Sequence, residues 1–300
     1  MKVGLIDLGS NSIRLVVYEV LGDQLIKLIN LKQHAQSILY IKDNKMTQEG
    51  IELIVTVLDE LIEVVGTFDV DYFKIFATAS LRNIENSKEA VGAIESMIHY
   101  PIEVLSDIEE TMYGFEGVLK QEKLPQKGLL MDVGGGSIEL TYFEHDKPIH
   151  THSLAIGSLT FYHNHVFELI PTSTEQANMR ADIQLKYNGI EWLRNIEVDT
   201  VVGIGGSARA LLRLAREMQK KPIRETSSVL TKSNVHDLSY LDIQASKLIL
   251  KATPNRLITI IPAAIMIDEL MRLTHAKTFQ ASSYGVREGY LFKRLLQTKA

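Results

Sequence analysis

The sequence predicts an α/β protein built from two related domains, each a mixed sheet flanked by helices. Its 300 residues lie at the upper limit of what one hydrophobic core serves, about 250–300 residues. Segments 4–19 and 129–144 resemble each other, which indicates an internal repeat. In each half, consecutive strands precede strands that alternate with helical patterns, and this order is typical of a mixed sheet covered by helices.

Each copy of the repeat consists of an apolar strand, a turn of small residues and a second strand with alternating apolar positions. Residues 4–19 read GLIDLGSNSIRLVVYE, and residues 129–144 read LLMDVGGGSIELTYFE. This pattern predicts a β-hairpin near the start of each of two domains, with boundaries 1–124 and 125–300. At an offset of 125 residues, the residues of the first copy that recur in the second include Asp7, Gly9, Ser12, Ile13, Leu15 and Glu19.

The other elements follow from the spacing of apolar residues. For the first half we expect strands at 24–31, 72–77 and 102–105, and helices at 48–65, 87–99 and 107–121. For the second half we expect strands at 128–133, 138–144, 147–156, 199–204 and 277–280, and helices at 157–167, 174–194 and 286–296. On the helix at 174–194, Trp192 is expected to lie in the core together with Leu185.

The composition is that of a globular protein, with 45% apolar and 23% charged residues, and it argues against a disordered chain. The absence of cysteine excludes disulfides, thiolate metal sites and a cysteine nucleophile. With 32 basic and 37 acidic residues, the net charge of −5 offers no broad positive field for nucleic acid. An anionic ligand would therefore have to be bound by a few hydrogen-bond donors or cations that point at it.

No apolar stretch approaches the roughly 20 residues of a membrane span. The apolar run 257–267 is interrupted by Pro262 and predicts a buried helix instead. The first residues, MKVGLIDLGS, contain no long apolar run and do not resemble a signal peptide. We expect a cytoplasmic protein without a membrane partner.

Four turns of small residues follow apolar strands and predict a cradle for phosphate groups. Glycine lets backbone N–H groups approach an anion, and hydroxyl groups add further donors. One such turn alone would most often be only a tight connection, but four in one chain favour a function. Arg14, next to the first turn, is a further candidate for phosphate. The candidates within the turns are Ser10, Asn11, Ser12, Thr78, Ser80, Gly134, Gly135, Gly136, Ser137, Gly205, Gly206 and Ser207.

Carboxylates next to these turns predict a divalent cation. Asp7 and Asp132 end their strands directly before a turn, and Glu139 follows two residues after Ser137. A carboxylate beside a phosphate is repulsive unless a cation lies between them, and Mg²⁺ is bound in this way through carboxylates, waters and phosphate oxygens. The alternative is that each aspartate only caps its turn.

Six motifs in a fixed order resemble the exopolyphosphatase and guanosine pentaphosphate phosphatase family (Ppx/GppA), within the actin-like ATPase superfamily. They are IDLGSNSIRLVV, ATASLRN, PIEVLS, MDVGGGSIEL, GIGGSARAL and YGVREGYL. The resemblance implies two actin-like (ribonuclease H-like) domains with a cleft between them, and a homodimer. It further implies Mg²⁺-dependent hydrolysis of the terminal phosphoanhydride bonds of polyphosphate, of guanosine pentaphosphate, or of both.

The resemblance also assigns a catalytic base and an arginine. The family's Ser-Gly-x-Glu-Glu-Ala-Arg run reads SDIEETM here, which places the base on Glu110. Arg82 matches an arginine that can bind phosphoryl oxygens in a bidentate manner. From the residues alone, Glu110 would be a solvated helix position, and its neighbour Glu109 would point about 100° away on a helix.

The chain departs from the family pattern near the base. Asp107 stands where the family usually has glycine, and Met112 where it usually has arginine. An additional acid and a lost arginine are expected to weaken the binding of a long polyanion. Two alternatives to the hydrolase therefore remain: a binding protein that does not hydrolyse its ligand, and a nucleotide-dependent phosphotransferase.

Overall fold

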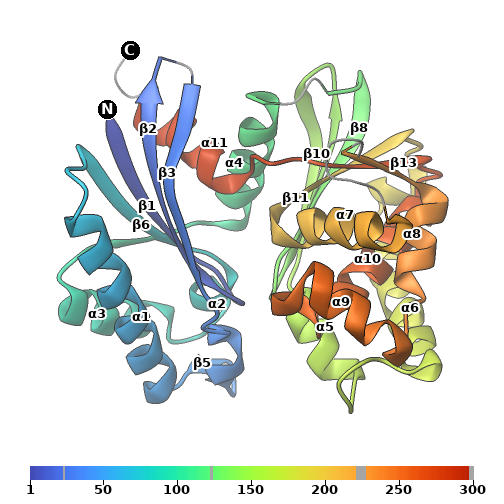
Figure 1. Ribbon diagram of the computed structural model, residues 1–300, viewed down its shortest axis with the longest axis horizontal. Helices are drawn as coiled ribbons and strands as arrows, with labels where there is room; N and C mark the ends of the chain where they lie inside the picture. The colour runs from blue at the N-terminus through green and yellow to red at the C-terminus, as the bar shows by residue number, and fades with distance from the viewer. Residues whose placement is uncertain (23, 122–123, 221–227, 297–300) are drawn as a thin grey trace. The chain divides into compact units, whose positions relative to one another are not determined.

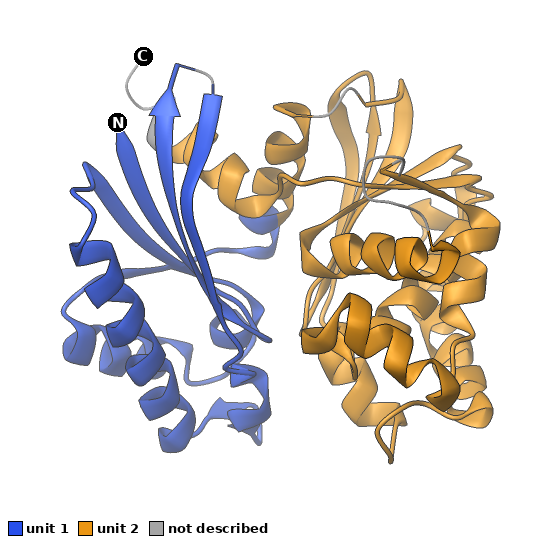
Figure 2. Ribbon diagram, viewed as in Figure 1, with its two compact units in different colours: residues 1–110 blue, residues 111–300 orange. Residues whose placement is uncertain are grey.

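The computed structural model describes residues 1–22, 24–121, 124–220 and 228–296 (Figure 1). The chain divides into two compact units, residues 1–110 and 111–300 (Figure 2). This division falls within helix α4 (Asp107–Leu119), whereas the sequence predicts a boundary after residue 124, and that boundary stays a prediction. No helix among the described residues combines the length and the apolar character needed to cross a bilayer.

Unit 1 contains a five-stranded mixed sheet in the order β3-β2-β1-β6-β7 (Figure 1). The first three strands form an antiparallel meander, while β6 and β7 continue from β1 in parallel. This is the predicted hairpin followed by strands that alternate with helices. The strands are β1 (Lys2–Leu8), β2 (Ile13–Leu21), β3 (Gln24–Gln33), β6 (Tyr72–Ala77) and β7 (Ile102–Val104).

Helices and a small ribbon complete unit 1. Helix α1 (Gln48–Gly66) begins at Thr47, whose side-chain oxygen accepts a hydrogen bond from the Gly50 N–H at 3.2 Å. Its apolar stripe packs against one face of the sheet and forms the unit's main core. The other elements are η1 (Ser37–Tyr40), β4 (Ile41–Lys42), β5 (Lys45–Met46), α2 (Ala79–Arg82) and α3 (Ser87–Ile98).

Unit 2 repeats this strand order and extends it, as β10-β9-β8-β11-β13-β12 (Figure 1). Strands β8, β9 and β10 form the antiparallel meander, and β11 and β13 continue from β8 in parallel. The strands are β8 (Lys127–Val133), β9 (Ile138–Glu144), β10 (Lys147–Leu154), β11 (Thr200–Ile204), β12 (Val229–Thr231) and β13 (Thr278–Ala281). The shared topology supports the internal repeat; the short strand β12 was not predicted.

The helices of unit 2 enclose a large apolar core. Helix α10 (Ile260–Leu273) is buried from Ile260 to Met271, so the apolar run around Pro262 is a buried helix as predicted. The others are α5 (Ser158–His165), α6 (Ser173–Asn188), α7 (Gly205–Gln219), α8 (Lys232–Ser239), α9 (Ser246–Ala252) and α11 (Val286–Tyr290). Short 3₁₀ helices are η2 (Trp192–Asn195), η4 (Ile243–Ala245) and η5 (Pro254–Arg256), and α11 continues into the π-helix η6 (Leu291–Leu296).

The helix predicted over 174–194 is shorter in the structure, and one residue was placed wrongly. Helix α6 ends at Asn188, before Gly189, and Trp192 lies in η2, where it packs partly buried against the core. Leu185 is 73% exposed and does not belong to the core. The apolar spacing predicted one continuous helix because the prediction did not treat Gly189 as the end of a helix.

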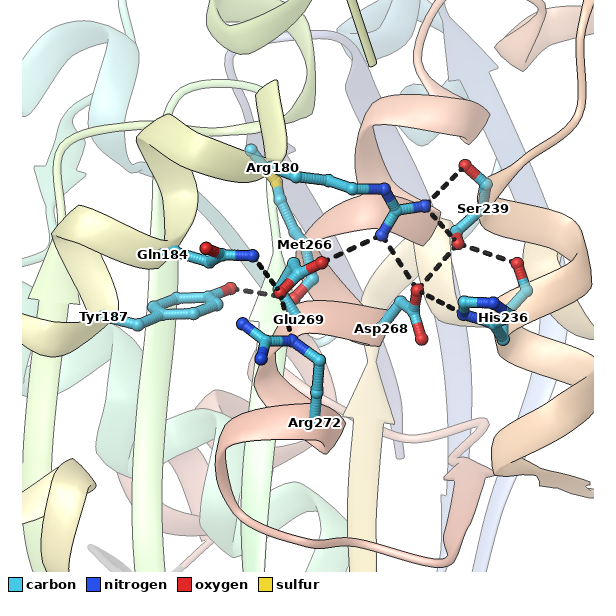
Figure 3. A network of polar contacts seen from close by, with 9 residues as sticks. All are labelled: Arg180, Gln184, Tyr187, His236, Ser239, Met266, Asp268, Glu269 and Arg272. Carbon is cyan, nitrogen blue, oxygen red and sulfur yellow. Dashed lines mark hydrogen bonds and ion pairs between the residues drawn. The ribbon is translucent and has the colours of Figure 1, made fainter. Parts of the chain in front are cut away.

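A buried polar network joins three helices of unit 2 (Figure 3). Arg180 on α6 donates through Nη1 to Asp268 at 2.9 Å and to Glu269 at 3.0 Å, both on α10. Its Nη2 donates to the carbonyl and the hydroxyl oxygen of Ser239 on α8, at 3.1 and 2.7 Å. Asp268 and Glu269 are each 4% exposed, so the guanidinium supplies the charge that lets two adjacent carboxylates be buried.

Candidate functional site

The two predicted hairpin turns adopt the same backbone arrangement. In unit 1 the Gly9 N–H donates to the Ser12 carbonyl at 3.2 Å, and in unit 2 the Gly134 N–H donates to the Ser137 carbonyl at 3.0 Å. These four residues correspond at the 125-residue offset of the repeat. The local sequence therefore specifies one turn geometry twice.

In unit 1 the outward carbonyl groups of the turn are bound by the segment before η1. The Gln36 N–H donates to the Asn11 carbonyl at 3.2 Å, and the Ile38 N–H donates to the Ser10 carbonyl at 3.3 Å. Within residues 1–22, 24–121, 124–220 and 228–296, no acceptor takes the N–H groups of Ser10 and Asn11. The turn is thus fixed by hydrogen bonds to its carbonyl groups, and its backbone N–H groups remain available to an anion.

In unit 2 the first turn of α5 holds the corresponding loop. The Ser158 N–H donates to the Gly134 carbonyl at 2.9 Å, and the Leu159 N–H donates to the Gly135 carbonyl at 3.0 Å. A Cβ atom on Gly157 would lie 2.4 Å from the carbonyl carbon of Gly135, so only glycine permits this approach. The free donors of the α5 N-terminus are consequently used to fix the loop rather than to bind a ligand.

The second pair of predicted turns follows the parallel strands of each sheet. The Thr78 N–H donates to the Leu8 carbonyl at 3.2 Å, which places Thr78 next to the first turn at the carboxyl end of β1. Ser80 is fully buried, and its hydroxyl has no hydrogen-bond partner in the described part of the chain. The side chain of Ser80 therefore lies inside unit 1, and its predicted role in phosphate binding is left to its backbone N–H.

Asp132 and Glu139 form a pair of neighbouring carboxylates in unit 2. They are directly opposite each other on β8 and β9, so both side chains leave the same face of the sheet. Glu139 is 3% exposed. Gly205, with φ of 81°, lies against them: a Cβ atom there would be 2.4 Å from Asp132 Oδ1. A side chain at position 205 would be strained and would displace the carboxylate.

This donor set fits Mg²⁺. The ion is commonly held by one or two carboxylates, with water and phosphate oxygens completing its octahedral shell. The described residues contain no group of three or more His, Cys, Asp or Glu suited to a metal, so a fully protein-made cage is not what they form. Two adjacent carboxylates beside a loop with free N–H donors match an ion that is shared with a phosphate ligand.

The equivalent pair in unit 1 consists of one acidic and one basic residue. Asp7 faces Arg14 across β1 and β2, in the register that Asp132 and Glu139 occupy in unit 2. The repeat therefore presents one acid and one base in unit 1 but two acids in unit 2. Arg14 is placed next to the Ser10–Ser12 turn, as its predicted role in phosphate binding requires.

The Gly205–Ser207 loop is occupied by an arginine that the sequence did not single out. Arg256 Nη1 donates to Ser207 Oγ at 3.0 Å, and that hydroxyl in turn donates to the Val133 carbonyl at 2.8 Å. A Cβ atom on Gly206 would lie 2.0 Å from Arg256 Nη2, so the guanidinium lies directly on the loop. Arg256 belongs to no repeated or glycine-rich motif, and only the packing of η5 beside α7 reveals it.

Glu110 and Arg82, the predicted base and arginine, form an ion pair within unit 1. Arg82 Nη1 lies 2.6 Å from Glu110 Oε2 and also donates to the Leu105 carbonyl at 3.1 Å. Glu110 is 8% exposed, so the interpretation of this residue as solvated helix surface is wrong. Glu109 turns back to cap the helix and accepts from the Ser106 N–H at 2.9 Å, which confirms that the two glutamates point in different directions.

Asp107 completes this cluster. Its Oδ1 lies 2.8 Å from Arg82 Nη2, and its side chain is 49% exposed, compared with 10% for Arg82. The guanidinium is therefore shared by one buried and one half-exposed carboxylate. The Nε of Arg82 donates to the Asn83 side chain at 3.2 Å, so the guanidinium is hydrogen-bonded through Nε and Nη1 and forms an ion pair with Asp107 through Nη2.

Solved structures define the class of protein to which this fold and these loops belong. An Aquifex aeolicus member of the Ppx/GppA family superposes with a TM-score of 0.80 and 22% identity, covering 100% of this chain and 99% of that one. An exopolyphosphatase from Cytophaga hutchinsonii gives a TM-score of 0.85 and 19% identity, with 99% and 98% coverage. The chain thus has the fold of two actin-like domains.

The sequence comparison is more specific than the fold. The model of the Ppx/GppA phosphatase family matches residues 29–298, and the chain belongs to this family. A Haemophilus influenzae protein, provisionally named an exopolyphosphatase, is 23% identical over 300 residues, which cover 97% of this chain and 90% of that protein. The chemistry of the family is the hydrolytic release of phosphate, and the six sequence motifs had predicted this membership.

Proposed function

We propose that this protein hydrolyses the terminal phosphoanhydride bonds of inorganic polyphosphate, of guanosine pentaphosphate, or of both. Its family membership supports the class of reaction. The observation that carries the proposal is the ion pair between Arg82 and Glu110. It joins a guanidinium suited to phosphoryl oxygens to a carboxylate suited to accept a proton from water.

Phosphate binding rests on the backbone donors of the loops. The turn at 9–12 in unit 1 and the turn at 134–137 in unit 2 are each fixed through hydrogen bonds to their carbonyl groups, which leaves backbone N–H groups for phosphate oxygens. Arg14 and Arg256 add positive charge beside these loops. Asp132 and Glu139 would hold Mg²⁺, which when bound would neutralise charge on the phosphate oxygens.

In the proposed reaction the terminal phosphoryl group takes the place of a carboxylate on Arg82. Glu110 then shares the guanidinium with a phosphoryl group in place of Asp107, and the negative charge of that group increases the affinity of Glu110 for a proton. A water oxygen bonds to the terminal phosphorus while the bridging P–O bond breaks in line with it. The water proton passes to Glu110, and orthophosphate leaves the shortened chain.

The substitution Glu110→Gln tests this role. We expect turnover to fall by about 100-fold or more because glutamine cannot accept the proton, while binding is retained. The measurement is phosphate release from polyphosphate and from guanosine pentaphosphate at matched concentrations, which also identifies the preferred substrate. Glu109→Gln is the matched control, since it removes the same charge from the adjacent helix position. Turnover of Glu110→Gln within a few-fold of wild type would place the base elsewhere.

A second candidate function, a binding protein without hydrolysis, is favoured by Asp107. This carboxylate engages Arg82 Nη2 at 2.8 Å and so competes with phosphate for the guanidinium. In that case guanosine polyphosphate or polyphosphate would bind in the presence of Mg²⁺ without release of phosphate. Calorimetric binding alongside the release assay separates the two functions.

A further inference from the structure

Helix α7 carries a stripe of arginines on its outer face. Arg209, Arg213 and Arg216 follow Gly206 at intervals of three, four and three residues. At about 100° per residue, these four positions fall within about 80° of the helix circumference. The opposite face packs into the core: Ser207, Ala208, Ala210, Leu211, Leu212, Leu214 and Ala215 are all buried. The arginines therefore share the side of the helix that points away from the core.

Two of these arginines have no acidic partner among the residues that the structure describes. Arg213 makes one hydrogen bond, from Nε to the Ala252 carbonyl at 3.4 Å. Arg216 Nε is buried and has no hydrogen-bond partner in the described chain. Partial desolvation lowers the pKa of Arg213, and the positive charge of Arg216 lowers it further. The two like charges thus act on each other, no carboxylate of the described segments is paired with either, and an anion would stabilise this arrangement.

The nearby acid on this face is already neutralised. Glu217 lies 2.5 Å from Lys251 of α9 in an ion pair. By contrast, the buried Arg180 of the same unit is provided with two carboxylates (Figure 3). In contrast to Arg180, Arg213 and Arg216 have no carboxylate partner within the described parts of the chain. The local charge of this face is accordingly positive.

The stripe is continuous with the phosphate loop. Helix α7 begins in that loop, and α9 and η5 run alongside it (Figure 1): Arg256 contacts Ser207, Arg213 contacts Ala252, and Glu217 contacts Lys251. With a rise of 1.5 Å per residue, Arg213 lies about 9 Å and Arg216 about 14 Å along the axis from Ser207. A linear anion that ends at the loop would reach both arginines a few phosphate units further along.

We propose that Arg213 and Arg216 form a second anion site that binds the distal part of an inorganic polyphosphate chain whose end lies at the Gly205–Ser207 loop. This rests on polyphosphate being a ligand of the proposed function. A polyphosphate carries charge on each repeating unit, which a row of guanidinium groups matches. Helix α7 contains no aromatic residue on which a nucleobase could stack, so the stripe suits a phosphate chain better than a nucleotide.

The consequence is a dependence on chain length. Tripolyphosphate is short enough to be held by the loop alone, whereas a long chain also reaches α7. The double variant Arg213→Gln/Arg216→Gln is therefore expected to bind long-chain polyphosphate about 10-fold more weakly and tripolyphosphate as wild type does. The slope of log affinity against log salt for the long chain should decrease by about one per arginine removed.

The experiment is isothermal titration calorimetry with long-chain polyphosphate and with tripolyphosphate. The control Lys88→Gln/Arg194→Gln removes two exposed positive charges away from α7 and should leave both affinities unchanged. The variant Arg213→Lys/Arg216→Lys should recover most of the long-chain affinity, which separates loss of charge from loss of packing. Thermal unfolding of all variants reports whether the fold is intact.

Several outcomes would overturn the proposal. They are equal weakening for tripolyphosphate, equal weakening in the control variant, unchanged long-chain binding in the double glutamine variant, or no long-chain binding by wild type. Binding of single-stranded RNA as tight as that of polyphosphate would indicate a general polyanion surface instead. If wild-type protein binds long polyphosphate in this arginine-dependent manner but releases no phosphate, the proposed hydrolase function fails and the second site stands.

Discussion

At the scale of single residues, the cluster of Arg82, Asp107 and Glu110 concentrates charge at one point of unit 1. Two carboxylates share one guanidinium, which gives the cluster a net charge of −1, and both ion pairs are 2.8 Å or shorter. A phosphate that binds Arg82 has to replace one of the two carboxylates. Asp107 is the more exposed of the two and can turn into water at little cost, so we expect it to be the one that leaves.

Removing the charge of Asp107 should therefore strengthen substrate binding. For Asp107→Asn we expect KM for polyphosphate to fall about 3- to 10-fold with little change in kcat, because the competing carboxylate is lost while Glu110 is retained. Steady-state kinetics of phosphate release provide the measurement. Asp237→Asn, which changes an exposed acid on α8, serves as the control for net charge. An equal fall in KM for both variants would show that the effect is long-range electrostatics.

At the scale of elements, the loops are fixed by backbone contacts rather than by side chains. The first turn of α5 donates to the carbonyl groups of the 134–137 loop, and this requires the two chain segments to touch at Gly157. The loop geometry consequently depends on a residue outside the loop and outside any phosphate-binding motif.

The substitution Gly157→Ala should weaken phosphate binding although the added methyl group contacts the 134–137 loop and not the phosphate. Its Cβ atom would lie 2.4 Å from the Gly135 carbonyl carbon, so the loop must shift. We expect the affinity for tripolyphosphate to fall about 10-fold or more in calorimetry. Gly92→Ala on α3, where a Cβ atom meets nothing within 4 Å, is the matched control and should stabilise the fold by about 0.5–1 kcal/mol. Unchanged affinity in Gly157→Ala would mean that the loop can move without affecting binding.

The polar network between α6, α8 and α10 leads to a prediction about stability (Figure 3). Replacing Arg180 with methionine removes the buried cation that Asp268 and Glu269 share and leaves them only the more exposed His236 and Arg272, so we expect a loss of about 3–5 kcal/mol in the free energy of unfolding. Urea unfolding followed by fluorescence reports on this unit, because Trp192 is the protein's single tryptophan. Arg272→Ala removes a 57% exposed partner of Glu269 and should cost less than about 1 kcal/mol. Similar losses of stability in both variants would show that the buried ion pairs of Arg180 contribute no more than the exposed ion pair of Arg272.

At the scale of the whole molecule, the sequence predicted those features that depend on neighbouring residues. The repeated hairpins, the turns and most helix and strand positions follow from local periodicity, and the order of six motifs indicated the family. Arg256 was missed because its role depends on η5 packing beside α7. The burial of Glu110 was missed from the residues alone because its partner Arg82 is 28 residues away. The spacing of Arg209, Arg213 and Arg216 was visible, but only the structure shows that Arg213 and Arg216 have no carboxylate partner among the residues it describes.

Some expectations remain predictions. These are the bound Mg²⁺, the choice between polyphosphate and guanosine pentaphosphate, the homodimer and the cytoplasmic location. The substrate and the metal can be decided in the same assays as Glu110→Gln, by adding a chelator and by varying the substrate. Each of these measurements uses the full chain.

The two hairpins of the repeat differ in one consequential way. The same register places Arg14 opposite Asp7 in one unit and Glu139 opposite Asp132 in the other. The two copies of the repeat have the same hairpin register and differ at this position in the sign of one charge, which suits them to different ligands. One copy retains a side chain complementary to an oxyanion, and the other retains a pair complementary to a cation. Reversing the charge at either position, as in Arg14→Glu or Glu139→Arg, would give both hairpins the same pair of charges. The difference between the two units at this position would then be lost.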